Sequence, residues 1–184
     1  MDKGWRNALA GVCVLIGLVM LVCLPGVVAI ALPNDGPRLT ERLDIGYGVY
    51  IDPPADARLT VDSRPGTGDV GIDTADGGYL ALTARRFTGD PQPFIDHAIA
   101  RLTWDPPDPS AERVRLPGAG FTGVRHYLPN PFDDETGECL TVVTAGTAAS
   151  RVGVTALVSG VPDCDAVPDT VQRAIDSLSI EESP

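Results

Sequence analysis

The sequence predicts an α+β domain in which two amphipathic helices pack on a mainly antiparallel β-sheet, preceded by one N-terminal transmembrane helix. Three observations lead to this prediction. Residues 8–32 form an unbroken apolar run. The chain after it alternates short segments of period-two hydrophobicity with turn residues, and two segments, 90–102 and 166–178, change to a helical period. Each of these helices has a single apolar stripe, so each must cover a sheet face.

The apolar run from Ala8 to Leu32 contains no charged residue. A helix of this length rises about 37 Å, which is enough to cross a hydrocarbon core of roughly 30 Å with some tilt. Lys3 and Arg6 precede the run, so the positive-inside rule leaves residues 1–7 in the cytoplasm and places the chain after Pro33 outside. We therefore expect a single-pass signal anchor in the cell membrane, with the lipid bilayer as the partner of residues 8–32.

A cleaved secretory signal is the alternative interpretation. Pro25 and Gly26 would end an apolar helix that starts at Ala8, and Ala29-Ile30-Ala31 would form the cleavage pattern. The apolar stretch from Ala8 to Leu24 is long for a signal and just long enough for a span, which favours the anchor. Cleavage would make the protein secreted, and both interpretations export the domain.

Charge is distributed unevenly along the 184 residues. The whole chain has a net charge of −11, but without Asp2, Lys3 and Arg6 the predicted exported part holds 24 acidic and 12 basic residues, a net charge of −12. Nucleic acids and anionic membrane surfaces bind basic patches. This acidity argues against nucleic acid as a partner.

Cysteine usage agrees with export. Cys13 and Cys23 lie in the apolar run, where a thiol behaves as a small hydrophobe, and each follows Val where a lipoprotein signal has a small residue. The exported part then holds only Cys139 and Cys164. An even pair in an oxidising compartment predicts one disulfide, with two free thiols as the alternative. A metal site is disfavoured because neither histidine is near the pair in sequence.

Residues 33–42 hold prolines, a glycine and mixed charges without an apolar period, and they predict a linker. The extracytoplasmic domain is expected over residues 43–180, which is ample for one core, and residues 181–184 form a tail. Its first strands are expected over residues 43–51, 57–62, 70–72 and 79–87, with a hairpin turn at Asp76-Gly77-Gly78.

A helix is expected to follow over residues 90–102. Asp90 can cap it and Pro91 suits its first position. One face is apolar and carries Phe94, Ile95, Ala98, Ile99 and Leu102. His97 lies on the opposite face, where a solvated side chain is the favoured interpretation.

The second half of the domain predicts further strands and a last helix. The strands are expected over residues 113–116, 120–128, 139–145 and 151–159, with an acidic loop over 133–138 and a hairpin connection over 146–150. Cys139 begins a strand whose cross-strand neighbours lie near the end of the next, so residues 160–164 can fold back over it. Closing a loop of about 25 residues contributes roughly 3 to 4 kcal/mol. The link is expected to fasten the final helix, 166–178, to the sheet edge.

The sequence offers little that predicts catalysis. It has no Gly-x-Ser-x-Gly, no His-Glu-x-x-His and no phosphate-binding glycine loop, and nothing in the spacing of Ser150, Ser159 and His126 selects a triad. The acidic loop 133–138 and the turn 73–77 could offer oxygens to a hard cation. Neither has the register of an EF-hand, so solvated loops are favoured. No catalytic, cofactor-binding or metal residue is predicted.

The order of the predicted elements, strands, helix, strands and helix, is similar to that of a known family. The first strand ends in Gly-Val-Tyr-Ile-Asp-Pro-Pro (residues 48–54), a helix and a long hairpin follow, and the last helix closes on Ile-Asp-Ser-Leu-Ser-Ile (residues 175–180). Over most of the domain this order resembles the small exported or envelope-anchored proteins of actinobacteria with a PsbP/Mog1-like fold. The resemblance implies binding or assembly rather than catalysis. It supplies no catalytic residues to transfer, and this chain lacks the lipobox of the lipoprotein members.

We therefore expect a membrane-anchored extracytoplasmic binding or accessory module of the bacterial cell envelope, and not an enzyme. Its sheet face or its hairpin would contact another envelope protein or an apolar small ligand. The alternative is an exported hydrolase-like enzyme with a site not visible in the sequence. Convergent titratable residues in a pocket would favour the enzyme, whereas a dry cleft or a bare apolar patch would favour binding.

Overall fold

The computed structural model describes residues 36–102, 111–117 and 120–181, apart from the side chain of Asp134. The chain divides into two units, residues 1–35 and 36–184, and every described residue belongs to the second. The predicted transmembrane helix over residues 8–32 lies outside the described residues. Within the described ranges, no helix is long and apolar enough to cross a membrane.

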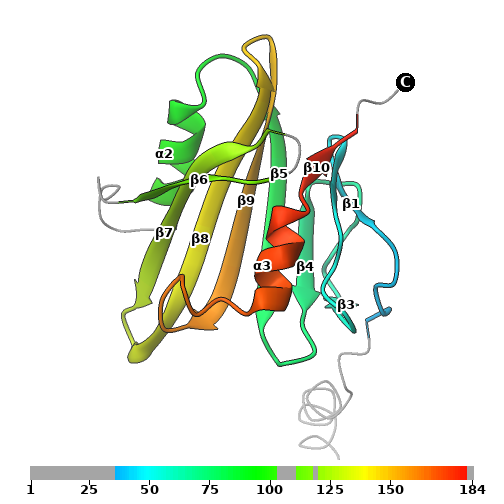
Figure 1. Ribbon diagram of the computed structural model, residues 1–184, viewed down its shortest axis with the longest axis vertical. Coiled ribbons are helices and arrows are strands. Elements are labelled where there is room, and N and C mark those ends of the chain that lie inside the picture. Colours follow the sequence, from blue (N-terminus) through cyan, green and yellow to red (C-terminus); the bar gives the residue numbers. More distant parts are fainter. Residues whose placement is uncertain (1–35, 103–110, 118–119, 182–184) are drawn as a thin grey trace, which may run out of the picture. The chain divides into compact units, whose positions relative to one another are not determined.

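Two antiparallel sheets and two helices build the described domain, as Figure 1 shows. The larger sheet has the strand order β3-β4-β5-β9-β8-β7-β6, and the smaller has the order β1-β2-β10. This sheet-dominated α+β architecture confirms the predicted class of the domain. The bounds are β1 Leu43–Gly46, β2 Val49–Ile51, β3 Arg58–Leu59, β4 Asp69–Asp73, β5 Tyr79–Phe87, α2 Gln92–Ala100, β6 Glu112–Arg115, β7 Thr122–Asn130, β8 Asp133–Thr147, β9 Ser150–Val161, α3 Asp169–Asp176 and β10 Ser179–Ile180.

β1 and β2 replace the single strand predicted for this stretch, so that prediction was wrong. The chain reverses at Gly46, Tyr47 and Gly48, whose φ angles are 126°, 59° and 78°. These angles lie in the left-handed region that glycine enters most readily. Both strands bury alternate apolar residues in the core. The apolar period therefore continues across the turn and hides it.

The two helices cover opposite faces of the seven-stranded sheet. Leu140 and Val142 of β8 pack in a cluster with Ile95 and Ile99 of α2, whereas Val143 belongs to the main core. Successive strand residues point to opposite faces. In Figure 1, α3 accordingly lies in front of the sheet and α2 behind it.

Helix α2 packs closely against the sheet because a glycine lies beneath it. A Cβ atom on Gly153 of β9 would come within 2.3 Å of the Phe94 ring. That ring stacks on Phe87 of β5, with centroids 4.8 Å apart. The helix begins at Gln92, two residues later than expected, and Asp90 Oδ1 accepts a 2.8 Å hydrogen bond from the Gln92 amide.

Helix α3 and the three-stranded sheet enclose the main core on the other face. Val171, Ala174 and Ile175 of α3 are buried in that core. After the helix, β10 pairs with β2, an element that the sequence analysis missed. The Arg42 guanidinium holds this pairing, since it contacts the Glu181 carboxylate and lies 5.1 Å from the centre of the Tyr50 ring.

Candidate binding surface at the β7–β8 turn

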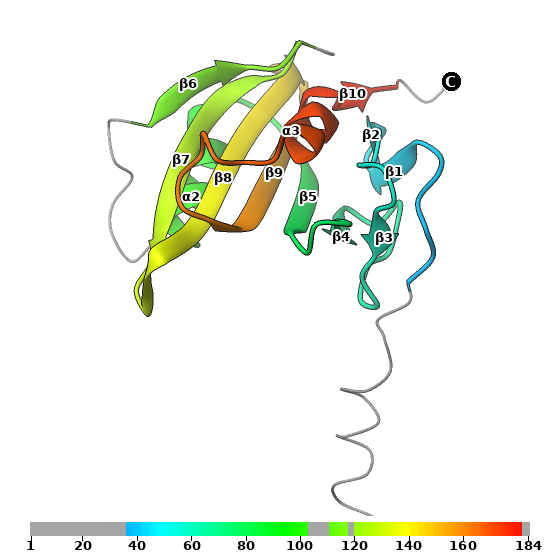
Figure 2. The same ribbon diagram turned by 60° about the horizontal axis from the view of Figure 1, so that its bottom comes forward.

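The predicted disulfide between Cys139 and Cys164 is present, with Cα atoms 5.0 Å apart. Cys139 pairs across the strands with Val158 of β9, as the hairpin geometry led us to expect. Figure 2 shows the loop between β9 and α3 passing over the face of β8. β8 is an inner strand, with β7 and β6 beyond it. The bond therefore fastens the segment before α3 to the middle of the sheet, and the expectation of an edge attachment was wrong.

The acidic segment predicted as a loop over residues 133–138 is part of strand β8, so that prediction was wrong. Asn130 at the end of β7 pairs with Asp133 at the start of β8, which leaves only Pro131 and Phe132 in the turn. The pairing shifts register between Pro129 and Asn130. Residues 134–136 therefore have no partner in β7 and form an irregularity within β8.

Side-chain hydrogen bonds fix the turn at both ends. Asn130 Oδ1 accepts a 3.0 Å hydrogen bond from the Phe132 amide. Asp133 Oδ1 accepts one of 3.0 Å from the Glu135 amide, and Asp133 Oδ2 accepts one of 2.6 Å from the Thr136 hydroxyl. The Thr136 hydroxyl, followed by the Glu135 amide, holds the pKa of Asp133 below its ordinary value of 3.8. The Asp133 carboxylate is thus ionised at neutral pH.

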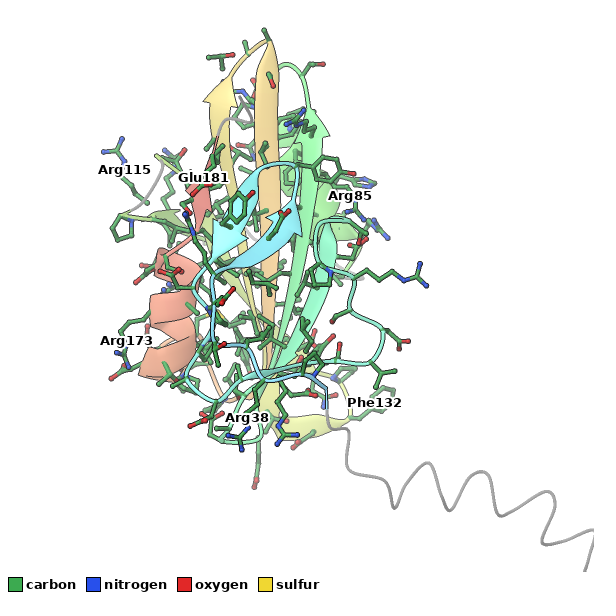
Figure 3. All side chains as sticks on the ribbon, turned by 90° about the vertical axis from the view of Figure 1, so that its right-hand side faces the viewer. Arg38, Arg85, Arg115, Phe132, Arg173 and Glu181 are labelled. Atoms are coloured by element: carbon green, nitrogen blue, oxygen red, sulfur yellow. A yellow bond between two sulfur atoms is a disulfide. The ribbon has the colours of Figure 1, made fainter. Side chains whose placement is uncertain are left out.

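Phe132 projects from this turn with 95% of its surface exposed. It is the most exposed of the large apolar side chains in the described part of the domain. Pro131 beside it is also exposed. Figure 3 shows Phe132 at the same end of the domain as Arg38. Sequence reasoning passed over Phe132, although an aromatic residue between a proline and three acids was the available signal.

Two of the acids after the turn, Glu135 and Glu138, have different surroundings. Glu138 accepts a 3.0 Å hydrogen bond from the Ser159 hydroxyl on β9, while Glu135 is exposed. Within residues 36–102, 111–117 and 120–181, no group of three or more His, Cys, Asp or Glu side chains is arranged to hold a metal ion.

The second acidic stretch, residues 73–77, forms the turn between β4 and β5. Asp76 accepts hydrogen bonds from the Thr74 hydroxyl and, at 3.4 Å, from the Gly78 amide. The Thr74 hydroxyl is the main cause of the lowered pKa of Asp76. This carboxylate therefore stabilises its own turn.

The remaining side chains considered for catalysis lie apart. His97 is exposed on α2, as predicted. His126 lies on β7, where it pairs with Leu140 of β8. Ser150 pairs with Thr147 at the other end of the β8–β9 hairpin, and Ser159 bonds Glu138. The structure does not bring these residues together.

The sheet face was expected as a contact surface, and on β5 two of its polar side chains bind a neighbouring carboxylate. The Thr83 hydroxyl donates a 3.1 Å hydrogen bond to Asp69. The Arg85 guanidinium binds both oxygens of the same carboxylate, at 2.9 and 2.8 Å. Figure 3 shows Arg85 projecting on the side away from α3. The β7–β8 turn, which the sequence did not predict as a contact surface, has an exposed aromatic side chain and is the stronger candidate for a binding surface.

Comparison with known proteins adds a likeness of fold. No family model and no curated protein matches the chain. A crystal structure of a protein from Bacteroides thetaiotaomicron is similar, with a TM-score of 0.50 and 12% sequence identity. The likeness covers 79% of this chain and 50% of that one, so this chain spans about half the length of that protein. At this identity the likeness concerns the fold alone.

Proposed function

We propose that this chain is a membrane-anchored extracytoplasmic binding or accessory module of the bacterial cell envelope, of the PsbP/Mog1-like kind. The uncharged apolar run over residues 8–32 supports the anchor. The Cys139–Cys164 disulfide supports an oxidising compartment for the domain. The sheet-dominated α+β fold is compatible with the resemblance.

The exposure of Phe132 is the observation that carries the binding function. Phe132 is 95% exposed, so its ring contributes almost nothing to the folded core. Its position in a two-residue turn is one that Gly, Asn, Asp and Ser usually occupy for conformational reasons. Aromatic side chains are enriched in the buried centres of protein interfaces. Contact with another molecule accounts for a phenylalanine at this place, whereas folding does not.

The rigidity of the turn supports the same function. The Asn130 side chain accepts a hydrogen bond from the amide of Phe132 itself, and the Asp133 side chain accepts one from the amide of Glu135. A side chain presented on a fixed backbone loses less conformational freedom when it binds. The backbone that carries the Phe132 ring is thus fixed before a partner binds.

Site-specific photo-crosslinking in intact cells tests this function. A benzoylphenylalanine in place of Phe132 in the full-length chain is expected to form a discrete protein adduct after irradiation. The same probe in place of His97, exposed on α2 at a distance from the turn, is the matched control and is expected to give none. Irradiation without any adduct at position 132 would count against a binding role for this turn.

A further inference from the structure

We infer that Phe132 inserts into an apolar pocket of a partner protein and that arginine or lysine side chains border this pocket. The inference rests on the proposed binding function and specifies the partner's chemistry. It follows from the small size of the apolar tip of the turn, which consists of Pro131 and Phe132, and from the charged side chains that follow them.

The size of the apolar tip requires a pocket rather than a flat surface. Only Pro131 and Phe132 are apolar at the turn, and the exposed Asp133 and Glu135 follow at once. Contact with a broad apolar surface would remove water from these carboxylates without supplying hydrogen bonds or opposite charges in its place, and this desolvation is unfavourable. A pocket of about one aromatic ring receives Phe132 and leaves the carboxylates at its border.

The charge at the tip selects a cationic border. Asp133 and Glu135 carry exposed carboxylates beside the ring, and the hydrogen bonds from Thr136 and from the Glu135 amide stabilise the charged form of Asp133. Opposite charges across an interface accelerate association and exclude partners with the wrong charge. An anionic lipid surface and a second copy of this domain, each carrying net negative charge, are disfavoured on the same ground.

The test combines photo-crosslinking at position 132 with neutralisation of the two described acids beside it. The full-length chain with benzoylphenylalanine at position 132, mixed with its own isolated cell envelopes, is compared with the same chain carrying Asp133→Asn and Glu135→Gln. The control carries Glu41→Gln and Glu112→Gln, which remove the same charge at two exposed sites outside the turn. Initial adduct yield is measured at low and high concentrations of sodium chloride.

Neutralisation at the turn is expected to lower the adduct yield about tenfold at low salt, whereas the control variant behaves as the parent. Added salt is expected to lower the yield of the parent and to have little effect on the neutralised variant. Mass spectrometry of the adducted peptide is expected to place arginine or lysine next to apolar residues in the partner.

Each other outcome has a distinct meaning. Adducts that are insensitive to both neutralisation and salt would overturn the cationic pocket and leave the binding function intact. Adducts with lipid, or with a second copy of the chain, would overturn the partner class. Absence of any adduct with the parent would instead contradict the proposed binding function itself.

Discussion

At the residue scale, two phenylalanines of this domain have opposite roles. Phe121 is completely buried in the main core, whereas Phe132 is 95% exposed at the β7–β8 turn. The same side chain therefore contributes to folding in one place and, as we propose, to binding in the other. Composition alone does not distinguish them, because the difference lies in the surroundings that the fold creates.

Alanine substitutions separate these two roles. Phe132→Ala is expected to change the free energy of unfolding by less than about 0.5 kcal/mol, because an exposed ring loses no packing. Phe121→Ala is expected to cost about 3 to 5 kcal/mol, because it leaves a cavity in the core. Urea denaturation of the two variants measures both values. A large loss for Phe132→Ala would mean that the ring has a packing role and would weaken the binding proposal.

The pKa of Asp133 gives a second prediction at this scale. Thr136→Val removes the hydroxyl that lowers this pKa most, so the pKa should rise toward 3.8. Carboxyl NMR shifts followed against pH measure the change, and Thr122→Val on β7 is the control. An unchanged Asp133 titration in Thr136→Val would contradict the hydrogen bond as the cause.

Thr136→Val also gives a prediction for how the stability of the domain changes with pH. Because the folded pKa of Asp133 is below the unfolded one, its stabilisation is present above the unfolded pKa. That stabilisation is lost as pH falls through the folded pKa. With the shift reduced, Thr136→Val should show a smaller loss of stability on acidification than the parent chain.

At the scale of elements, the sequence predicts those whose pattern is local and misses those that depend on distant partners. β5 was expected over residues 79–87 and has these bounds, because its apolar alternation ends at clear turn residues. The helices α2 and α3 were expected two to three residues longer at each end. Helix ends depend on capping and packing more than on periodicity.

β10 and the start of β8 show what sequence patterns lack. Ser179 and Ile180 form a strand only because β2, far away in sequence, offers an edge. Asp133, Gly137 and Glu138 belong to a strand because β7 pairs with them, although the charge of residues 133–138 is typical of a loop. Counting cysteines predicted the disulfide. No pattern predicted the candidate binding turn, since the exposure of Phe132 is a property of the folded chain.

The disulfide gives the prediction at this scale. Replacing both Cys139 and Cys164 by alanine opens a closed loop with a sequence separation of 25, and is expected to lower the free energy of unfolding by roughly 3 to 4 kcal/mol. Urea denaturation measures the loss. A reductant should produce a similar loss in the parent chain and no further loss in the variant. A parent chain indifferent to reductant would show that the bond does not stabilise the domain.

At the scale of the whole molecule, the N-terminal segment and the domain carry separate roles in the proposed function. The net charge of −12 belongs to the part after Pro33, and a net charge far from zero favours the solubility of that part. The uncharged run before it is what would keep this acidic domain at the membrane. Two of the four cysteines lie in the N-terminal segment and two in the domain. The reactivity of the thiols therefore tests both the retention of the segment and the disulfide of the domain.

Thiol counting on the denatured full-length chain tests the anchor and the disulfide together. The membrane fraction should contain a chain in which Cys13 and Cys23 react with maleimide, and all four cysteines should react after reduction. A mature N-terminus at Leu32 in the culture medium, with no reactive thiol before reduction, would show cleavage and refute the anchor.

The smaller sheet joins the two ends of the described domain, because β2 lies between β1 and β10. The Ser179 hydroxyl and the Tyr50 carbonyl, which form one of its contacts, are 129 positions apart in the chain. A domain that folds while it emerges N-terminus first would hold β2 with an open edge until Ser179 and Ile180 arrive. Completion of this sheet would then await β10, and a chain truncated before Ser179 would keep that edge available to other strands.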